Sequence, residues 1–170
     1  LSQDNYEAAI DRFETAIELD PNADGPYQGL GQVYYSQGAL DEAVQQLREA
    51  IRLNPQNSLA HLYLGWVYMG RAEFEEAVEQ FETLIGLQPD WGAPHAFLAS
   101  TYYQLDQVDL AEREIQEALN LQAEDALTSN ALGLAYSGLR QFSKAEAQLL
   151  KSIELWPDAD YIYIDLAYVY

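Results

Sequence analysis

The side chains that could perform acid–base or metal chemistry are few in this sequence of 170 residues. It contains no cysteine, which excludes disulfides and thiolate metal sites, and it has only two histidines, His61 and His95. Both share the apolar side of their predicted helices with Leu64 and Leu98, so we expect packing residues rather than a metal pair. No serine has a histidine at a suggestive position. The sequence therefore predicts no enzyme, no metal site and no cofactor.

Ion and phosphate sites are also not indicated. Gly29 and Gly31 lie within a predicted helix, and no strand precedes them as it does in a phosphate-binding loop. The carboxylates do not follow the spacing of a calcium-binding loop.

The chain is strongly acidic, with 28 acidic and 8 basic residues and a net charge of −20. Nucleic acid is disfavoured as a partner because binding it needs clustered Lys and Arg, and an anionic membrane surface is disfavoured for the same reason. No run of 18 or more apolar residues is present, so we expect no membrane insertion. Two lysines, no cysteine and strong acidity fit a bacterial or archaeal protein, cytoplasmic or exported.

A 34-residue pattern organises the chain and must position any site. Counting from Asp24, the seventh position is always leucine: Leu30, Leu64, Leu98, Leu132 and Leu166. The eighth position is always small: Gly31, Gly65, Ala99, Gly133 and Ala167. The eleventh is always tyrosine: Tyr34, Tyr68, Tyr102, Tyr136 and Tyr170. Proline ends most units, with Ala123 as the exception.

This pattern resembles the tetratricopeptide repeat, a helix-turn-helix unit of 34 residues, over the whole chain. The resemblance implies an all-α fold, a right-handed α-solenoid spanning 1–170 as one domain. Four complete repeats are expected at 24–57, 58–91, 92–125 and 126–159. Half-repeats are expected at 1–23 and 160–170. The predicted helices cover 1–20, 24–37, 40–53, 58–70, 74–87, 92–104, 108–121, 126–138, 142–155 and 160–170, with Gly38, Gly70 and Gly138 as turn breakers.

The two half-repeats are complementary. Tyr170 is the eleventh position of its unit and Leu1 is the twelfth, so a second copy would continue in phase. Two explanations remain open: a piece of a longer array, or a subunit that completes the split repeat end to end. We expect a larger parent or self-association, such as a structural array or filament.

Charge and aromatic residues divide between the two kinds of helix. All eight basic residues lie on second helices or turns, and twelve of the thirteen tyrosines lie on first helices. The first helices are therefore neutral, aromatic and nearly apolar all round, which is typical of buried helices.

Helical spacing separates two faces of each first helix. Positions 4, 7, 8 and 11 cluster on one side as core, and positions 2, 5, 9 and 12 cluster opposite. The resemblance implies that the opposite side lines a concave groove for extended or helical peptides. The predicted groove residues are Gln28, Gln32, Tyr35, Leu62, Trp66, Met69, Tyr103, Asn130, Leu134, Ile164 and Tyr168.

The function expected from this resemblance is a non-enzymatic scaffold that binds a peptide or partner helix. Part of that family grips a C-terminal carboxylate with Lys, Arg and Asn on these helices. Asn130 is the only polar match here, so we expect no such clamp. The acidic field favours a neutral or basic partner with apolar anchors. Two alternatives stay open: the groove side chains pack against neighbouring repeats, or they contact another copy of the chain.

Overall fold

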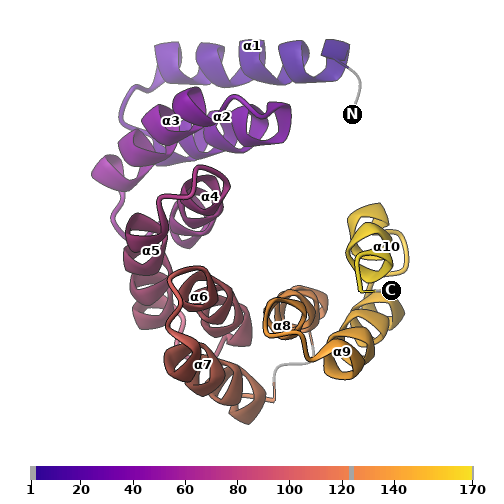
Figure 1. Ribbon diagram of the computed structural model, residues 1–170. Coiled ribbons are helices and arrows are strands. Elements are labelled where there is room, and N and C mark those ends of the chain that lie inside the picture. Colours follow the sequence, from indigo (N-terminus) through magenta and orange to yellow (C-terminus); the bar gives the residue numbers. More distant parts are fainter. Residues whose placement is uncertain (1–2, 123–124, 170) are drawn as a thin grey trace. The chain divides into compact units, whose positions relative to one another are not determined.

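The computed structural model describes residues 3–122 and 125–169, and this part of the chain folds into consecutive helices without strands (Figure 1). The helices are α1 (Gln3–Leu19), α2 (Asp24–Gln37), α3 (Leu40–Leu53), α4 (Ser58–Gly70), α5 (Phe74–Leu87), α6 (Gly92–Gln104), α7 (Val108–Asn120), α8 (Ala126–Gly138), α9 (Phe142–Leu155) and α10 (Asp160–Ala167). The all-α prediction and nearly all the predicted helix bounds are confirmed. The largest difference is α10, which ends at Ala167. Leu1, Ala123 and Tyr170 lie outside the described residues.

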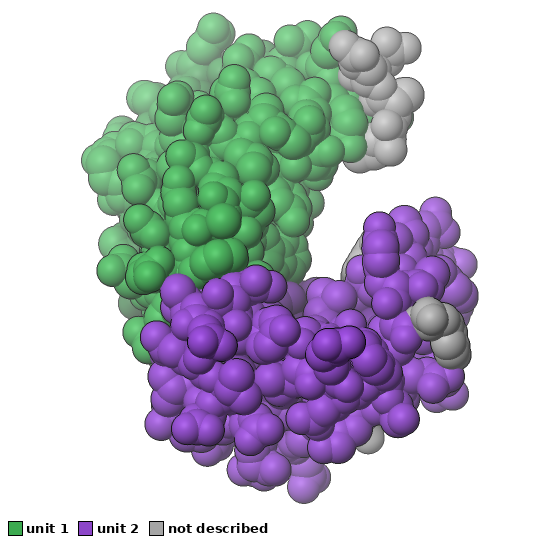
Figure 2. Space-filling view, viewed as in Figure 1, with its two compact units in different colours: residues 1–87 green, residues 88–170 purple. Residues whose placement is uncertain are grey.

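The chain divides into two compact units, Leu1–Leu87 and Gln88–Tyr170 (Figure 2). The first unit holds α1 to α5 and the second holds α6 to α10. The boundary falls in the turn between α5 and α6, where the predicted repeat 58–91 gives way to the repeat 92–125. The prediction that all repeats form one domain stays a prediction.

Within each unit, a small residue on a first helix lets the paired second helix approach closely. In the first unit, a Cβ added at Gly31 would collide with Leu47, and one at Gly65 would lie 2.5 Å from the Phe81 ring. Leu47 and Phe81 are fully buried, which is why the eighth position of the repeat is small. The second unit repeats the arrangement with Gly133 against Leu149.

Polar side chains begin some of the first helices. The Asn57 Oδ1 atom accepts a hydrogen bond of 2.9 Å from the Ala60 N–H at the start of α4. The Asp125 Oδ1 atom accepts one of 2.7 Å from the Thr128 N–H at the start of α8. Each bond satisfies an N–H group that the first helical turn leaves unpaired, so these helices begin at defined residues.

The turns inside the repeats differ from the sequence prediction. Gly38 ends α2 with φ +74°, as expected of a turn glycine. Gly70 and Gly138 are the last helical residues of α4 and α8, as the predicted bounds 58–70 and 126–138 have them, but they do not form the turns themselves. In the later repeats, the left-handed residue occupies the repeat position of Gly38, two residues after the end of the helix. These residues are Ala72 (φ +57°), Asp106 (φ +60°) and Arg140 (φ +57°). Gly138 is small for another reason, because a Cβ there would lie 3.0 Å from the Tyr103 ring.

Candidate functional site

Three aromatic rings form a cluster on the first helices of the first unit. Tyr35 of α2 lies 6.0 Å from Tyr63 and 6.1 Å from Trp66 of α4, measured between ring centroids. Tyr63 and Trp66 meet edge to face at 5.1 Å, the geometry that the ring quadrupoles favour. All three side chains are partly exposed. We call Tyr35, Tyr63 and Trp66 the aromatic cluster.

The surroundings of the aromatic cluster are uncharged. Gln32 of α2 is exposed, Gln28 and Met69 are partly exposed, and Leu59 at the start of α4 is about half exposed. Apart from Asp24 at the start of α2, the two helices carry no charged residue. Burial raises the pKa of the Tyr35 phenol above its ordinary value, because the ionised form would lose contact with water. This surface can therefore offer apolar contact and neutral hydrogen bonds.

Two of the predicted groove residues, Leu62 and Asn130, are buried. Leu62 is only 3% exposed, and it lies on α4, which packs against α2. Asn130 of α8 is also 3% exposed, and its Nδ2 donates a 2.9 Å hydrogen bond to Oδ2 of Asp165 on α10. Leu62 and Asn130 are therefore not accessible to a partner, whereas Ile164, at the same repeat position, is exposed.

The second unit presents a more open set of predicted groove residues. Leu134 of α8 is exposed, Ile164 of α10 is 57% exposed, and Tyr168 just after α10 is 81% exposed. Tyr103 of α6 is partly buried, with its ring near Gly138 of α8. These side chains provide apolar surface on the second unit.

Two residues at the sixth position of the repeat belong to these surfaces and were not predicted. Tyr63 completes the aromatic cluster, and Asp165 pairs with Asn130. Burial raises the pKa of Asp165, and the hydrogen bond from Asn130 opposes this only in part. The available signal was spacing: Tyr63 precedes Trp66 by three residues, which places both rings on neighbouring parts of one helix surface.

Both histidines lie on the packed side of their helices, where the sequence placed them. Both ring nitrogens of His61 have partners: Nδ1 lies 2.9 Å from Oε1 of Gln80 and Nε2 lies 3.1 Å from the Pro55 carbonyl oxygen. The Nδ1 atom of His95 lies 2.8 Å from Oε2 of Glu114. Across residues 3–122 and 125–169, no three His, Cys, Asp or Glu side chains gather as metal ligands would. No helix in those ranges has the length and apolar character to cross a membrane.

Solved structures with similar folds include TPR proteins. A thermophilic TPR protein from Thermus thermophilus matches with a TM-score of 0.76 and 20% identity, over 96% of this chain and 90% of that one. YrrB, described as a TPR protein with an unusual peptide-binding site, matches with a TM-score of 0.61 and 22% identity over 93% and 81%. The APC/C hetero-tetramer Cut9–Hcn1 matches with a TM-score of 0.79 and 17% identity, over 97% of this chain and 33% of that one.

A comparison of the sequence with curated proteins found no match. Family models match most of the chain. A TPR repeat model matches residues 1–38 and 31–71, and tetratricopeptide repeat models match residues 59–90 and 128–158. The chain therefore belongs to the tetratricopeptide repeat family, whose domains are generally protein–protein interaction modules and usually non-enzymatic scaffolds.

Proposed function

We propose that this chain is a non-enzymatic scaffold that binds a peptide or helix of a partner protein on the surface of its first helices. The aromatic cluster of the first unit carries the proposal. Its three rings are already held against one another, with centroid separations of 5.1 to 6.1 Å. Rigid Trp and Tyr side chains provide large contact areas at low entropic cost, which is why they dominate protein interfaces.

The residues around the cluster support an apolar anchor in the partner. Leu59 exposes about half of its side chain, and Met69 is flexible enough to adapt to different partner surfaces. Gln32 adds neutral donor and acceptor groups at the edge. A partner side chain such as leucine or phenylalanine would lose water on binding here without leaving a charge buried.

Electrostatics selects among partners that share this anchor. The net charge of −20 repels acidic segments, and the neutral surface of α2 and α4 makes no compensating salt bridge. A neutral or basic segment is favoured. Added salt should slow association of a basic segment more than that of a neutral one.

A displayed library of random peptides tests the proposal, with the chain as bait. Peptides recovered on the wild-type chain should bind the Trp66→Ala variant about tenfold more weakly or worse, because an interface anchor contributes about 1.4 kcal/mol or more. Leu59→Asp should weaken them as well, by adding a charge at an exposed position without leaving a cavity. Circular dichroism checks that both variants stay folded.

Trp156→Ala is the matched control, because this exposed Trp follows α9 and belongs to the second unit. Its affinity for the same peptides should equal that of the wild type. Peptides that bind Trp66→Ala and Leu59→Asp as tightly as the wild type would remove the assignment of this surface. Recovery of the chain only as a complex with itself would replace the foreign partner with a second copy.

A further inference from the structure

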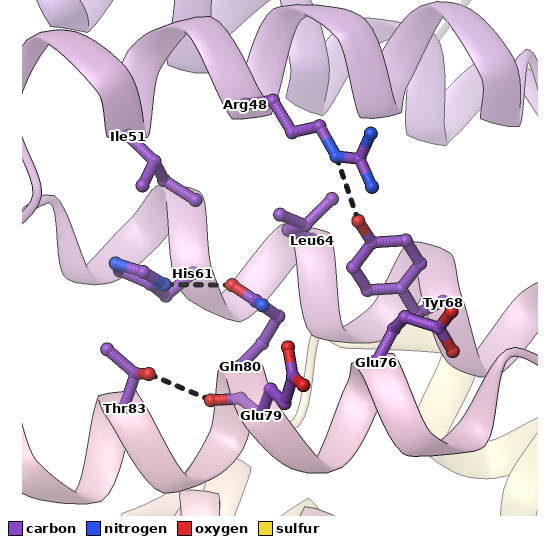
Figure 3. Close-up of a pocket in the computed structure, with 9 residues that line it drawn as sticks. All are labelled: Arg48, Ile51, His61, Leu64, Tyr68, Glu76, Glu79, Gln80 and Thr83. Carbon is purple, nitrogen blue, oxygen red and sulfur yellow. Dashed lines mark hydrogen bonds between the residues drawn. The ribbon is translucent and has the colours of Figure 1, made fainter.

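A cavity of about 320 Å³ opens between the second helices of the first unit, on the side of α4 that faces α3 and α5. Figure 3 shows side chains reaching into it from three helices: from α3 above, from α4 behind and from α5 below. Ile51 and Leu64 provide its apolar wall. None of the predicted groove residues lines it.

One wall of the cavity offers hydrogen-bond donors. The Nε atom of Arg48 donates a 3.0 Å hydrogen bond to the Tyr68 hydroxyl oxygen, and the guanidinium lies near the tyrosine ring. This bond holds the guanidinium at the cavity. Arg48 has no salt bridge in the described part of the chain, so its terminal N–H groups are available. Tyr68 is only 3% exposed, and its own O–H has no acceptor among the described residues.

The opposite wall offers acceptors. Glu76 and Glu79 of α5 line the cavity, and neither carboxylate forms a salt bridge or hydrogen bond with another described side chain. Figure 3 shows Glu79 extending from α5 below Leu64, and the Glu76 carboxylate beside the base of the Tyr68 side chain. Opposite charges therefore face each other across the cavity without meeting.

The combination of Arg48 with Glu76 and Glu79 is peculiar to this pair of repeats. The residues one repeat earlier that correspond to Arg48, Glu76 and Glu79 are Glu14, Glu42 and Gln45. Two repeats later, in the second unit, the corresponding residues are Gln116, Lys144 and Ala147. The apolar floor, by contrast, is shared, because Leu64 and Tyr68 occupy repeat positions that never vary. The solenoid scaffold alone thus does not account for the donors and acceptors at this cavity.

We infer that this cavity binds a small zwitterion of the α-amino acid class. The ligand carboxylate accepts hydrogen bonds from the Arg48 guanidinium and the Tyr68 hydroxyl, and its ammonium group donates to Glu76 and Glu79. A short apolar side chain lies against Ile51 and Leu64. A volume of 320 Å³ is at the small end of ligand sites, which suits a single amino acid. Binding is weak, because Arg48 and both glutamates are exposed to water.

Titration of the ¹⁵N-labelled chain with L-leucine, followed by amide chemical shifts, tests the inference. Shifts should centre on α3, α4 and α5 and saturate with a dissociation constant in the range of about 0.1–10 mM. Two probes that each lack one charge are compared at equal ionic strength: 3-methylbutylamine and 4-methylpentanoate. Each should bind about tenfold more weakly than leucine, because it leaves one wall of the cavity unpaired.

Arg48→Gln and the double change Glu76→Gln with Glu79→Gln should each weaken leucine binding about fivefold or more. These side chains are exposed, so the fold should persist. Glu42→Gln is the matched control, because Glu42 holds the position of Glu76 one repeat earlier, and it should leave binding unchanged. Three results would overturn the inference: no saturable shift, equal binding of the amine alone, or wild-type affinity in both variants.

Discussion

His95 and Glu114 form a largely buried pair between the two helices of one repeat. The His95 Nδ1 atom lies 2.8 Å from Oε2 of Glu114, a residue that is only 7% exposed. Its other carboxylate oxygen lies 3.2 Å from the Arg113 guanidinium. The preceding repeat places His61 and Gln80 at the same two positions, 19 residues apart, with a distance of 2.9 Å. The same contact between a histidine Nδ1 atom and a side-chain oxygen is therefore made with a carboxylate in one repeat and with an amide in the other.

Glu114→Gln should change the free energy of unfolding by less than about 1 kcal/mol, because it reproduces the pair found in the preceding repeat. His95→Ala should cost about 1–3 kcal/mol, since it leaves a buried carboxylate short of a hydrogen bond. The double variant should be more stable than His95→Ala alone, because a buried amide that has lost its histidine partner costs less than a buried carboxylate that has lost it. Thermal unfolding measures all three. A double variant less stable than His95→Ala would contradict this account.

Asp165 should make stability depend on pH. Burial raises its pKa above the ordinary 3.8, so the folded state holds the proton more tightly than the unfolded state. The contribution of protonated Asp165 to the free energy of unfolding is complete below pH 3.8. This contribution is lost as the pH rises through the higher pKa of the folded state. Asp165→Asn should therefore match the wild type in acid and become the more stable chain as the pH rises.

Melting temperatures at several pH values check this expectation. Asp158→Asn, on the exposed turn before α10, controls for the change in net charge. If the melting temperatures of Asp165→Asn and the wild type differed by the same amount at every pH, a raised pKa of Asp165 in the folded state would be refuted.

Gly65→Ala should destabilise the first unit by about 1–3 kcal/mol, because the new methyl group would overlap the fully buried Phe81 ring. Gly86→Ala is the control, because Gly86 lies on the same helix as Phe81. No atom lies within 4 Å of a Cβ added at Gly86. This change should stabilise the chain by about 0.5–1 kcal/mol, through the better helix propensity of alanine. Denaturant unfolding distinguishes the two. Equal effects of both substitutions would show that the contact between Gly65 and Phe81 can accommodate an added methyl group.

Ala72→Gly should stabilise the chain by about 1 kcal/mol, because Ala72 adopts a left-handed φ of +57° that glycine reaches without a steric cost. The reciprocal change, Gly38→Ala, places a Cβ at the equivalent turn, where φ is +74°, and should cost about as much. Melting temperatures of the two variants should move in opposite directions. A loss of stability in Ala72→Gly would mean that the left-handed turn carries no strain.

The sequence was enough to predict the helices, because the scaffold positions are nearly invariant from repeat to repeat. The leucine, the small residue and the tyrosine at positions 7, 8 and 11 mark one buried face, and the structure places Leu30, Leu64, Leu98 and Leu132 in the core. The residues that adopt the left-handed turn conformation are harder to predict from the sequence than the helices. Gly70 and Gly138 were read as breakers, yet alanine and arginine carry the left-handed turns of those repeats.

The accessible surface was predictable only in part. Spacing of 100° per residue indicates the direction of a side chain but not how closely the next helix approaches. Leu62 and Asn130, expected in a groove, are therefore buried. Tyr63 joins the aromatic cluster from the sixth repeat position, outside the predicted groove set. The cavity beside Arg48 was not predicted at all. Its lining comes from three helices, and only packed side chains show that the charges do not meet.

The seam of Gly65 against Phe81 has a consequence for how such a chain can diverge. Gly65 and Phe81 belong to neither the aromatic cluster nor the Arg48 cavity, these two sites share no residue, and Phe81 is fully buried. Substitutions at distant sites without shared partners act additively. The two neighbouring repeats at 24–57 and 58–91 can thus acquire, lose or exchange the specificity of either site while the other is left intact. Because the Gly65–Phe81 contact is part of neither site, substitutions can change one site without changing the other.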